Sequence, residues 1–219
     1  MAWIQRHAPR LPEAAPERIL SELQRLVRGD NADAAITTLK TLQLLRPWAA
    51  EGQLPAPADA EGLSSTEAAF ALPLSRLTAL ISDDGLAQLR ASRTLSQRCK
   101  RLRYWQERIG QAPESLPEAD RLQLHEELEE DLPALALQLP MPEKEIWLRR
   151  WRNAEDPLFH PRAPIDGTSL LTALGIQPGP GIGKLLHHLK REQAFRRIKT
   201  PREALAEAKR FLTRESDAL

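Results

Sequence analysis

A glycine-rich stretch near the carboxyl end of the chain has the residues that a phosphate-binding turn needs. Residues 175–184 read GIQPGPGIGK and lie between two runs of apolar residues at helical spacing. Glycine lets a backbone approach a ligand closely, and the free N–H groups and the dipole at a helix start attract an anion. The sequence therefore predicts phosphate contacts at Gly179, Gly181, Gly183 and Lys184. A second interpretation stays open, in which the glycines only let two helices pack closely.

Basic residues follow this turn along the chain. They are Lys190, Arg191, Arg196, Arg197 and Lys199. Such cations supply much of the affinity of a protein for RNA because they neutralise phosphates, and these contacts carry little sequence information. We predict that they extend the phosphate-binding surface, although solvated helix faces would show the same charge pattern.

A second basic stretch lies beside two aromatic residues. It contains Arg93, Arg98, Lys100, Arg101 and Arg103, followed by Tyr104 and Trp105. We predict RNA contacts for Arg98 and Arg101, and an aromatic side chain beside such cations could stack on a base. Trp105, however, lies on one apolar stripe with Cys99 and Leu102, so we expect it in the core. The other tryptophans are also expected to be packing residues: Trp3, Trp48, Trp147 and Trp151.

The residue patterns of catalysis are missing from this sequence. A nucleotidyl transfer site needs two carboxylates that hold magnesium, and the chain contains neither an Asp-x-Asp nor a Gly-Ser dipeptide. Asp83 and Asp84 fit a turn between helices, and His125 and His160 have no nucleophile at a readable spacing. Cys99, the single cysteine, excludes an internal disulfide and a cysteine-rich zinc site. We therefore expect no catalytic residue, no metal site and no cofactor in this chain.

The elements that would position the basic residues are helices. Apolar residues recur at intervals of three and four, and no stretch alternates convincingly with a period of two. We predict an all-α helical array without a sheet. The expected helices cover residues 16–28, 33–46, 65–81, 95–109, 117–132, 143–153, 168–174 and 182–189, with a last helix from residue 200; a turn at 83–85 divides the third from the fourth. Pro16, Thr168 and a capping box from Thr200 to Glu203 are the predicted helix starts.

Composition and charge distribution limit the class of partner. The chain has 219 residues, 42% of them hydrophobic and 28% charged, and can bury a core. No apolar run approaches the roughly 18 residues of a membrane helix, and no secretion signal is visible, so we expect a cytoplasmic protein without a membrane partner. Seven Lys or Arg face one Glu over 90–108, ten acids face two bases over 114–145, and ten bases face four Glu over 184–215. Basic stretches separated by an acidic one suggest a track for a polyanion.

Both ends of the chain resemble one enzyme family. Residues 164–186 contain Asp-Gly, Leu-Gly, Pro-Gly-Pro and Ile-Gly in that order, and a Thr-x-x-Glu-Ala helix follows at 200–204. This order is similar to the tail of bacterial class II tRNA nucleotidyltransferases, the CCA-adding enzymes and bacterial poly(A) polymerases. Near the start, IQRHA at 4–8 and APERI at 15–19 resemble the neck helix of that family. The middle resembles it only in being helical and rich in leucine.

The resemblance implies a neck-like helical hairpin at 1–50, a helical body at 65–155 and a helical tail at 164–214. In that family a head before the neck carries the metal-binding Asp residues, so magnesium and CTP or ATP are expected only with such a head. No catalytic residue can be carried over to this chain. Residues 155–159, EDPLF, mimic the nucleotide-selecting Glu-Asp-x-x-Arg motif, but Phe159 stands in place of arginine and the segment comes too late in the order.

The expected function follows from these two observations together. The chain would bind tRNA or another RNA during tRNA 3′-end processing and would be inactive alone, with the catalytic head supplied by a separate polypeptide or missing. Two other interpretations stay open: a stand-alone nucleic-acid-binding helical module, and a purely structural helical protein whose charges are solvated.

Overall fold

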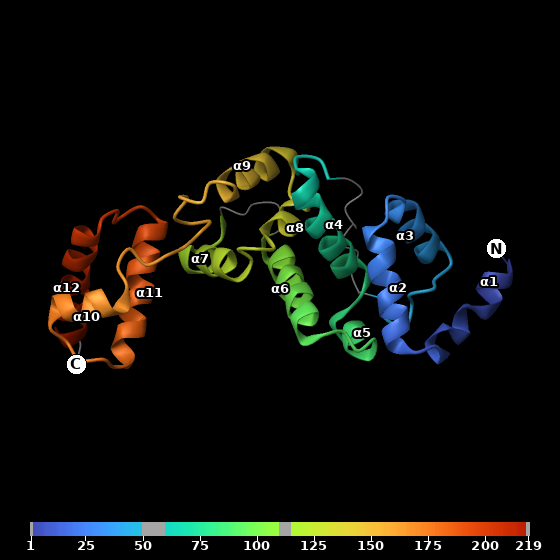
Figure 1. The fold of residues 1–219 in the computed structure, drawn as a ribbon, viewed down its shortest axis with the longest axis horizontal. Helices are drawn as coiled ribbons and strands as arrows, with labels where there is room; N and C mark the ends of the chain where they lie inside the picture. Colours follow the sequence, from blue (N-terminus) through green and yellow to red (C-terminus); the bar gives the residue numbers. More distant parts are fainter. Residues whose placement is uncertain (1, 50–59, 110–114, 218–219) are drawn as a thin grey trace. The chain divides into compact units, whose positions relative to one another are not determined.

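The computed structural model describes residues 2–49, 60–109 and 115–217, which fold into helices with no strand among them (Figure 1). The all-α expectation is confirmed. The chain divides into two compact units. Unit 1 comprises residues 1–113 and 130–148, and unit 2 comprises residues 114–129 and 149–219. The division into neck, body and tail stays a prediction, and the expected linker at 51–64 lies mostly outside the described residues.

The first part of unit 1 is a helical hairpin that follows a short amino-terminal helix. Its elements are α1 (Ala2–His7), the 3-10 helix η1 (Ala8–Glu13), α2 (Pro16–Arg28) and α3 (Ala32–Thr41). Pro16 starts α2 as predicted, since its fixed φ suits the first helical position. Leu20, Leu23 and Val27 bury one face of that helix. The expectation for Trp3 is wrong, because its side chain is 69% exposed and stacks on His7.

The helix predicted over 33–46 ends earlier, at Thr41. Gln43 adopts a positive φ of 53°, and the N–H groups of Gln43 and Leu44 donate to the carbonyl oxygens of Lys40 and Leu39 at 3.0 Å each. This is the left-handed Schellman ending of a helix, in which a polar residue replaces the more usual glycine. The chain that follows buries Leu42, Leu45 and Trp48.

Unit 1 is built around α4 (Ser65–Leu80), which contacts α2, α6 and α8 (Figure 1). The Ser64 and Glu67 side chains form a capping box that starts α4. The turn predicted at 83–85 is instead the start of α5 (Asp83–Gln88), because the Ser82 hydroxyl accepts a hydrogen bond from the Gly85 N–H at 2.9 Å. α6 (Arg93–Ile109) follows and buries Trp105 as expected.

The acidic helix predicted over 117–132 ends early, at Glu127, and the next helix begins only at Leu132. α7 (Glu118–Glu127) belongs to unit 2, and α8 (Leu132–Ala136) is fully buried in unit 1. Pro133 explains the interruption, since proline is accepted in the first turn of a helix but not in its interior. α9 (Met141–Trp151) covers most of the expected 143–153 and passes from unit 1 into unit 2 after Leu148; it buries Trp147 and half-buries Trp151.

Unit 2 packs α10 (Gly167–Leu174), α11 (Pro180–Ala194) and α12 (Pro201–Asp217) around one apolar cluster. Leu170, Leu185 and Leu189 are its buried leucines. Asp166, not Thr168, caps α10, because its carboxylate accepts from the Ser169 N–H at 2.9 Å. The predicted capping box of α12 is present, with reciprocal Thr200 and Glu203 hydrogen bonds of 3.2 Å. No helix in the described parts of the chain is long and apolar enough to cross a membrane.

Candidate RNA-binding surfaces

The predicted glycine stretch covers the loop between α10 and α11 and the first turn of α11, which begins at Pro180. Gly175 takes the left-handed conformation at φ 64° and ends α10. A Cβ added at Gly179, Gly181 or Gly183 would meet no described atom within 4 Å. The interpretation in which these glycines only allow close helix packing therefore has no support here. Lys184 is exposed and has no ion pair or hydrogen bond among the described residues, so its charge is available.

Two of the predicted phosphate-binding residues of the tail are engaged within unit 2. The Lys190 Nζ lies 2.8 Å from the Glu126 carboxylate, and Arg197 donates to Glu118 at 2.9 Å and to Glu192 at 2.6 Å. These bonds raise the pKa of Arg197 above its ordinary value, and the Arg197 hydrogen bond lowers the pKa of Glu192. Both cations connect α11, or the loop after it, to the acidic helix α7.

The other tail cations differ in how much charge they leave exposed. Arg191 is half-buried, with Nη2 3.4 Å from His188 and Nε 3.7 Å from Glu192. The Arg196 side chain is 64% exposed. Its Nη2 comes no closer than 3.8 Å to the Asp156 carboxylate, which makes this a long ion pair. Lys199 is exposed, and no partner of its side chain is found among the described residues. The structure thus leaves Lys184, Arg196 and Lys199 as the accessible cations of the predicted tail set.

The basic side chains of α6 have different surroundings. Arg98 donates to both oxygens of the Asp131 carboxylate, from Nε at 3.0 Å and from Nη2 at 2.6 Å, and Arg101 is exposed. Arg103 turns inward and donates to the carbonyl oxygens of Thr78 and Ile81. Tyr104, 45% exposed, is the aromatic residue that a base could reach.

Several titratable residues outside the basic stretches have structural partners. Burial raises the pKa of the Cys99 thiol, which makes a thiolate unfavourable at neutral pH. Burial would also raise the pKa of Asp156, yet hydrogen bonds from Arg150 and from the Phe159 and Leu158 N–H groups hold it below its ordinary value. Asp156 therefore fixes a turn in the EDPLF segment. Among the described residues, no group of three or more His, Cys, Asp or Glu is placed to hold a metal ion.

The amino-terminal segment carries cations that sequence reasoning missed. Its acids are nearly all engaged: Glu13 with Arg10, Glu22 with Arg25, Glu17 with Arg90 and Asp33 with Arg76. Its unpaired cations, judged against the described residues, are Arg6, Arg18, Arg28, Lys40 and Arg46. A sequence signal existed for Arg28 and Arg46, since neither has an Asp or Glu three or four positions away to form a helical ion pair.

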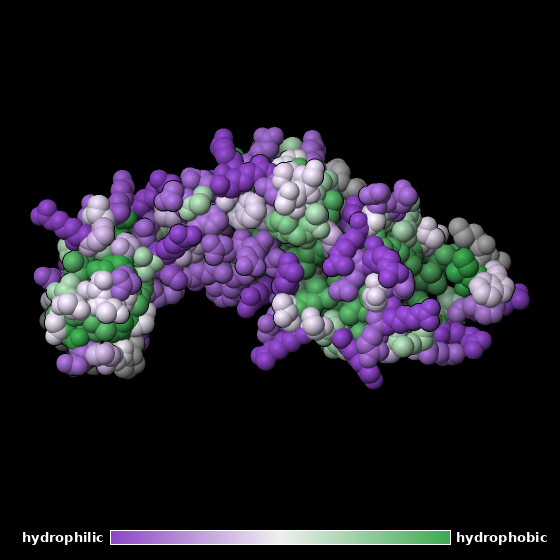
Figure 2. Space-filling view, in the orientation of Figure 1, coloured by the Kyte–Doolittle hydropathy of each residue, from purple (hydrophilic) through white to green (hydrophobic). Residues whose placement is uncertain are grey.

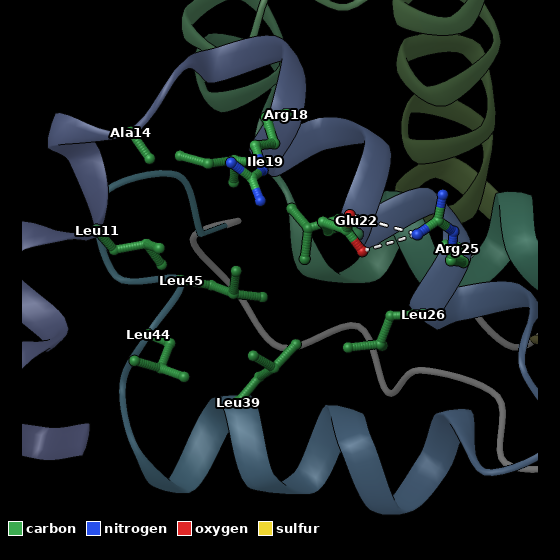
Figure 3. A pocket seen from close by; sticks show the side chains of 11 residues that line it. Leu11, Ala14, Arg18, Ile19, Glu22, Arg25, Leu26, Leu39, Leu44 and Leu45 are labelled. Atoms are coloured by element: carbon green, nitrogen blue, oxygen red, sulfur yellow. Dashed lines mark hydrogen bonds and ion pairs between the residues drawn. The ribbon is translucent and has the colours of Figure 1, made fainter. Parts of the chain in front are cut away.

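Two pockets of different chemistry adjoin this segment. One, of about 460 Å³, is lined by the polar side chains of Thr41, Gln43 and Arg46 together with residues at the start of η1. The other, of about 480 Å³, is apolar and lies between η1, α2 and α3 (Figure 3). Leu26, Leu39 and Leu45 are among the leucines that converge on it, and Figure 2 shows apolar surface in this part of unit 1.

Comparison with known proteins identifies the same segment. Residues 1–51 match the family model described as "Probable RNA and SrmB-binding site of polymerase A". This match supports RNA binding by a chain related to poly(A) polymerases. Searches of the curated proteins and of the solved structures found no match.

Proposed function

We propose that this chain is the RNA-holding part of a tRNA nucleotidyltransferase or poly(A) polymerase system. It binds tRNA through phosphates and supports 3′-end nucleotide addition when a catalytic head is supplied. The observation that carries the proposal is the set of unpaired cations inside the segment that matches an RNA-binding site. The resemblance of residues 164–186 to the family tail supports the choice of tRNA as the RNA.

The electrostatic part of RNA binding depends on which cations are free. A cation that is already paired with a carboxylate gains little from a phosphate, because the first partner must be given up. A free cation releases condensed counterions when it meets a phosphate, and this makes binding depend on salt. In residues 1–51 the acids pair partly with Arg76 and Arg90 from other helices of unit 1, so the segment keeps unpaired arginines of its own.

A pair of triple variants tests this proposal. Replacing Arg18, Arg28 and Arg46 by Gln removes three free cations, whereas replacing Arg10, Arg25 and Arg90 by Gln removes three paired ones from the same unit. Fluorescence anisotropy with labelled tRNA over a salt series measures the tRNA affinity of both triple variants. The first triple should weaken binding about tenfold or more and lower the salt slope by roughly two to three, since each phosphate contact contributes about 0.7 to 0.9. The second should change affinity much less. Equal losses would contradict the proposal.

The proposal also covers the chemistry of nucleotide addition. Magnesium held by a carboxylate pair activates the attacking oxygen and neutralises the leaving phosphates. In our proposal that pair belongs to the head, so the chain alone should not incorporate CTP or ATP into tRNA. A radiolabelled incorporation assay with and without magnesium checks this. Metal-dependent incorporation by the purified chain would overturn it.

A second candidate function has one specific observation in its favour. The matched family model names SrmB as well as RNA. The leucine-lined pocket of about 480 Å³ suits an apolar protein segment and not a phosphate (Figure 3). We propose that it takes an apolar segment of a protein such as SrmB. Leu39→Asp should abolish co-purification with added SrmB and leave tRNA affinity within about twofold; a change in tRNA binding alone would contradict this assignment.

A further inference from the structure

A third pocket joins the amino-terminal segment to the predicted RNA-binding arginine of α6. It lies between α2, α4 and α6 and has a volume of about 170 Å³. Its lining combines apolar side chains with Gln24, Arg28, Phe70 and Arg98. This space is large enough to admit one flat nucleobase.

The aromatic and amide groups of this pocket suit a base. Phe70 is 36% exposed, so part of its ring faces solvent instead of the core. An unstacked base is bound by stacking on such a ring and by hydrogen bonds to its polar edge. The Gln24 side chain offers both a donor and an acceptor for that edge. Leu74 and Leu77 of α4 line the same pocket and exclude water.

Arg98 and Arg28 would contact different parts of the nucleotide. Arg98 is held by its hydrogen bonds of 3.0 and 2.6 Å to Asp131, whose side chain is 9% exposed, while Arg98 itself stays 40% exposed. Because Asp131 already balances its charge, Arg98 acts as an oriented hydrogen-bond donor. Arg28 is exposed and has no ion pair or hydrogen bond to a described residue, so it can neutralise the phosphate next to the base.

We propose that this pocket binds one unstacked base of a single-stranded RNA, with Phe70 stacked on the base and Arg28 on its phosphate. The inference rests on the proposed RNA-binding function and makes it more specific. Gln24 and Arg28 belong to the segment that matches an RNA-binding site, while Phe70 and Arg98 lie outside it. The pocket therefore extends the RNA-binding surface from the matched segment onto α4 and α6.

The first test changes the RNA and leaves the protein intact. The wild-type chain is titrated with a fluorescent single-stranded oligoribonucleotide and with an abasic ribose-phosphate oligomer of the same length. Stacking contributes roughly 1 to 3 kcal/mol per base, so the abasic oligomer should bind at least about fivefold more weakly. The salt slopes of the two should be equal, since the phosphates are unchanged. Equal affinities would overturn the base pocket.

The second test changes the aromatic ring. Phe70→Leu keeps an apolar side chain at this half-exposed position but removes the flat face. In an anisotropy titration with the single-stranded oligoribonucleotide, the variant should bind about fivefold more weakly than the wild type, with an unchanged salt slope. Ile146→Ala, at another exposed apolar position of unit 1, is the matched control and should behave as the wild type. An unchanged affinity in Phe70→Leu would overturn the inference.

A third comparison separates the inference from the function on which it rests. Arg28→Gln should lower the affinity and the salt slope more than Arg25→Gln, because Arg25 lies one turn earlier on the same helix and is paired with Glu22. If the wild type binds no RNA at all, the proposed function itself fails. If it binds duplex and single-stranded RNA equally and Phe70→Leu has no effect, the function stands and the base pocket is wrong.

Discussion

The amino-terminal segment of unit 1 and the tail of unit 2 both carry many cations, yet a larger share of those in the tail is engaged with other side chains of the same unit. In the tail, Lys190 and Arg197 are paired with Glu126 and Glu118, which stand 64 and 79 positions earlier in the sequence. In the amino-terminal segment the pairing works the other way, since Arg76 and Arg90 from later helices take up its acids. The density of basic residues along a sequence therefore does not measure the charge that RNA can meet.

The acidic stretch between the two basic ones illustrates the difference. By sequence it separates two basic tracks. In the structure, α7 neutralises part of the tail track, while Asp131 holds Arg98 of the other track. Of the predicted tail set, the glycine turn and the accessible cations Lys184, Arg196 and Lys199 remain able to meet a phosphate.

The largest effect we expect comes from the glycine that holds the amino-terminal segment in unit 1. A Cβ at Gly85 would lie 2.9 Å from the Trp48 Cα and closer still to its carbonyl oxygen, which also accepts from the Ser82 N–H. Gly85→Ala should lower the stability of unit 1 by about 3 kcal/mol in urea unfolding, because backbone cannot move aside easily. Gly183→Ala in unit 2, where the Cβ meets no described atom, should be neutral or stabilising by up to about 1 kcal/mol. Similar losses in both variants would contradict this contrast.

A second effect should distinguish the units by pH. Burial, with Arg150 nearby, lowers the pKa of His125 on α7 from 6.5 to about 3, although Asp156 acts in the opposite direction. The folded form thus keeps a neutral imidazole that the unfolded chain protonates below pH 6.5, so unit 2 loses stability as pH falls from there toward 3. At pH 5 the loss from this group is about 2 kcal/mol. Pulsed hydrogen exchange in urea at pH 7.5 and 5.0 measures it, and His125→Leu should remove most of it. The same pH loss in the variant would show that other groups are responsible.

A third prediction concerns the cations of the tail that remain accessible. Replacing Lys184, Arg196 and Lys199 by Gln should weaken tRNA binding by up to about tenfold and reduce its salt dependence. The stability of unit 2 should stay within about 0.5 kcal/mol, as is usual for exposed positions. Anisotropy titrations and urea unfolding on the same preparation give both quantities. An unchanged affinity would confine RNA binding to unit 1.

The smallest effect is expected for an engaged tail cation. Arg197 is 41% exposed, so its ion pairs with Glu118 and Glu192 are screened by solvent. Arg197→Gln should lower the stability of unit 2 by less than about 1 kcal/mol and leave tRNA affinity within about twofold. A tenfold loss of affinity would mean that RNA displaces these carboxylates, and the distinction between free and paired cations would fail.

Local signals in the sequence predicted much of the fold. Pro16 started α2, the Thr200 and Glu203 capping box started α12, and the apolar stripe through Cys99 and Trp105 was buried. These signals work because caps and helical periodicity depend on neighbours within four residues. The failures involve distant contacts or competing caps. The local sequence places Gly85 in a turn, and no spacing along the chain indicates its contact with Trp48.

The candidate site shows the same division between local and distant information. By itself, the sequence determined that the protein is helical, that its cations are concentrated in stretches, and that its ends resemble an RNA-handling enzyme family. Only the tertiary structure decided which cations are free and that Phe70, Arg28 and Arg98 share one pocket. The physical reason is that ion pairs and pockets form between side chains many tens of positions apart, and helix packing, which no local pattern encodes, brings those side chains together.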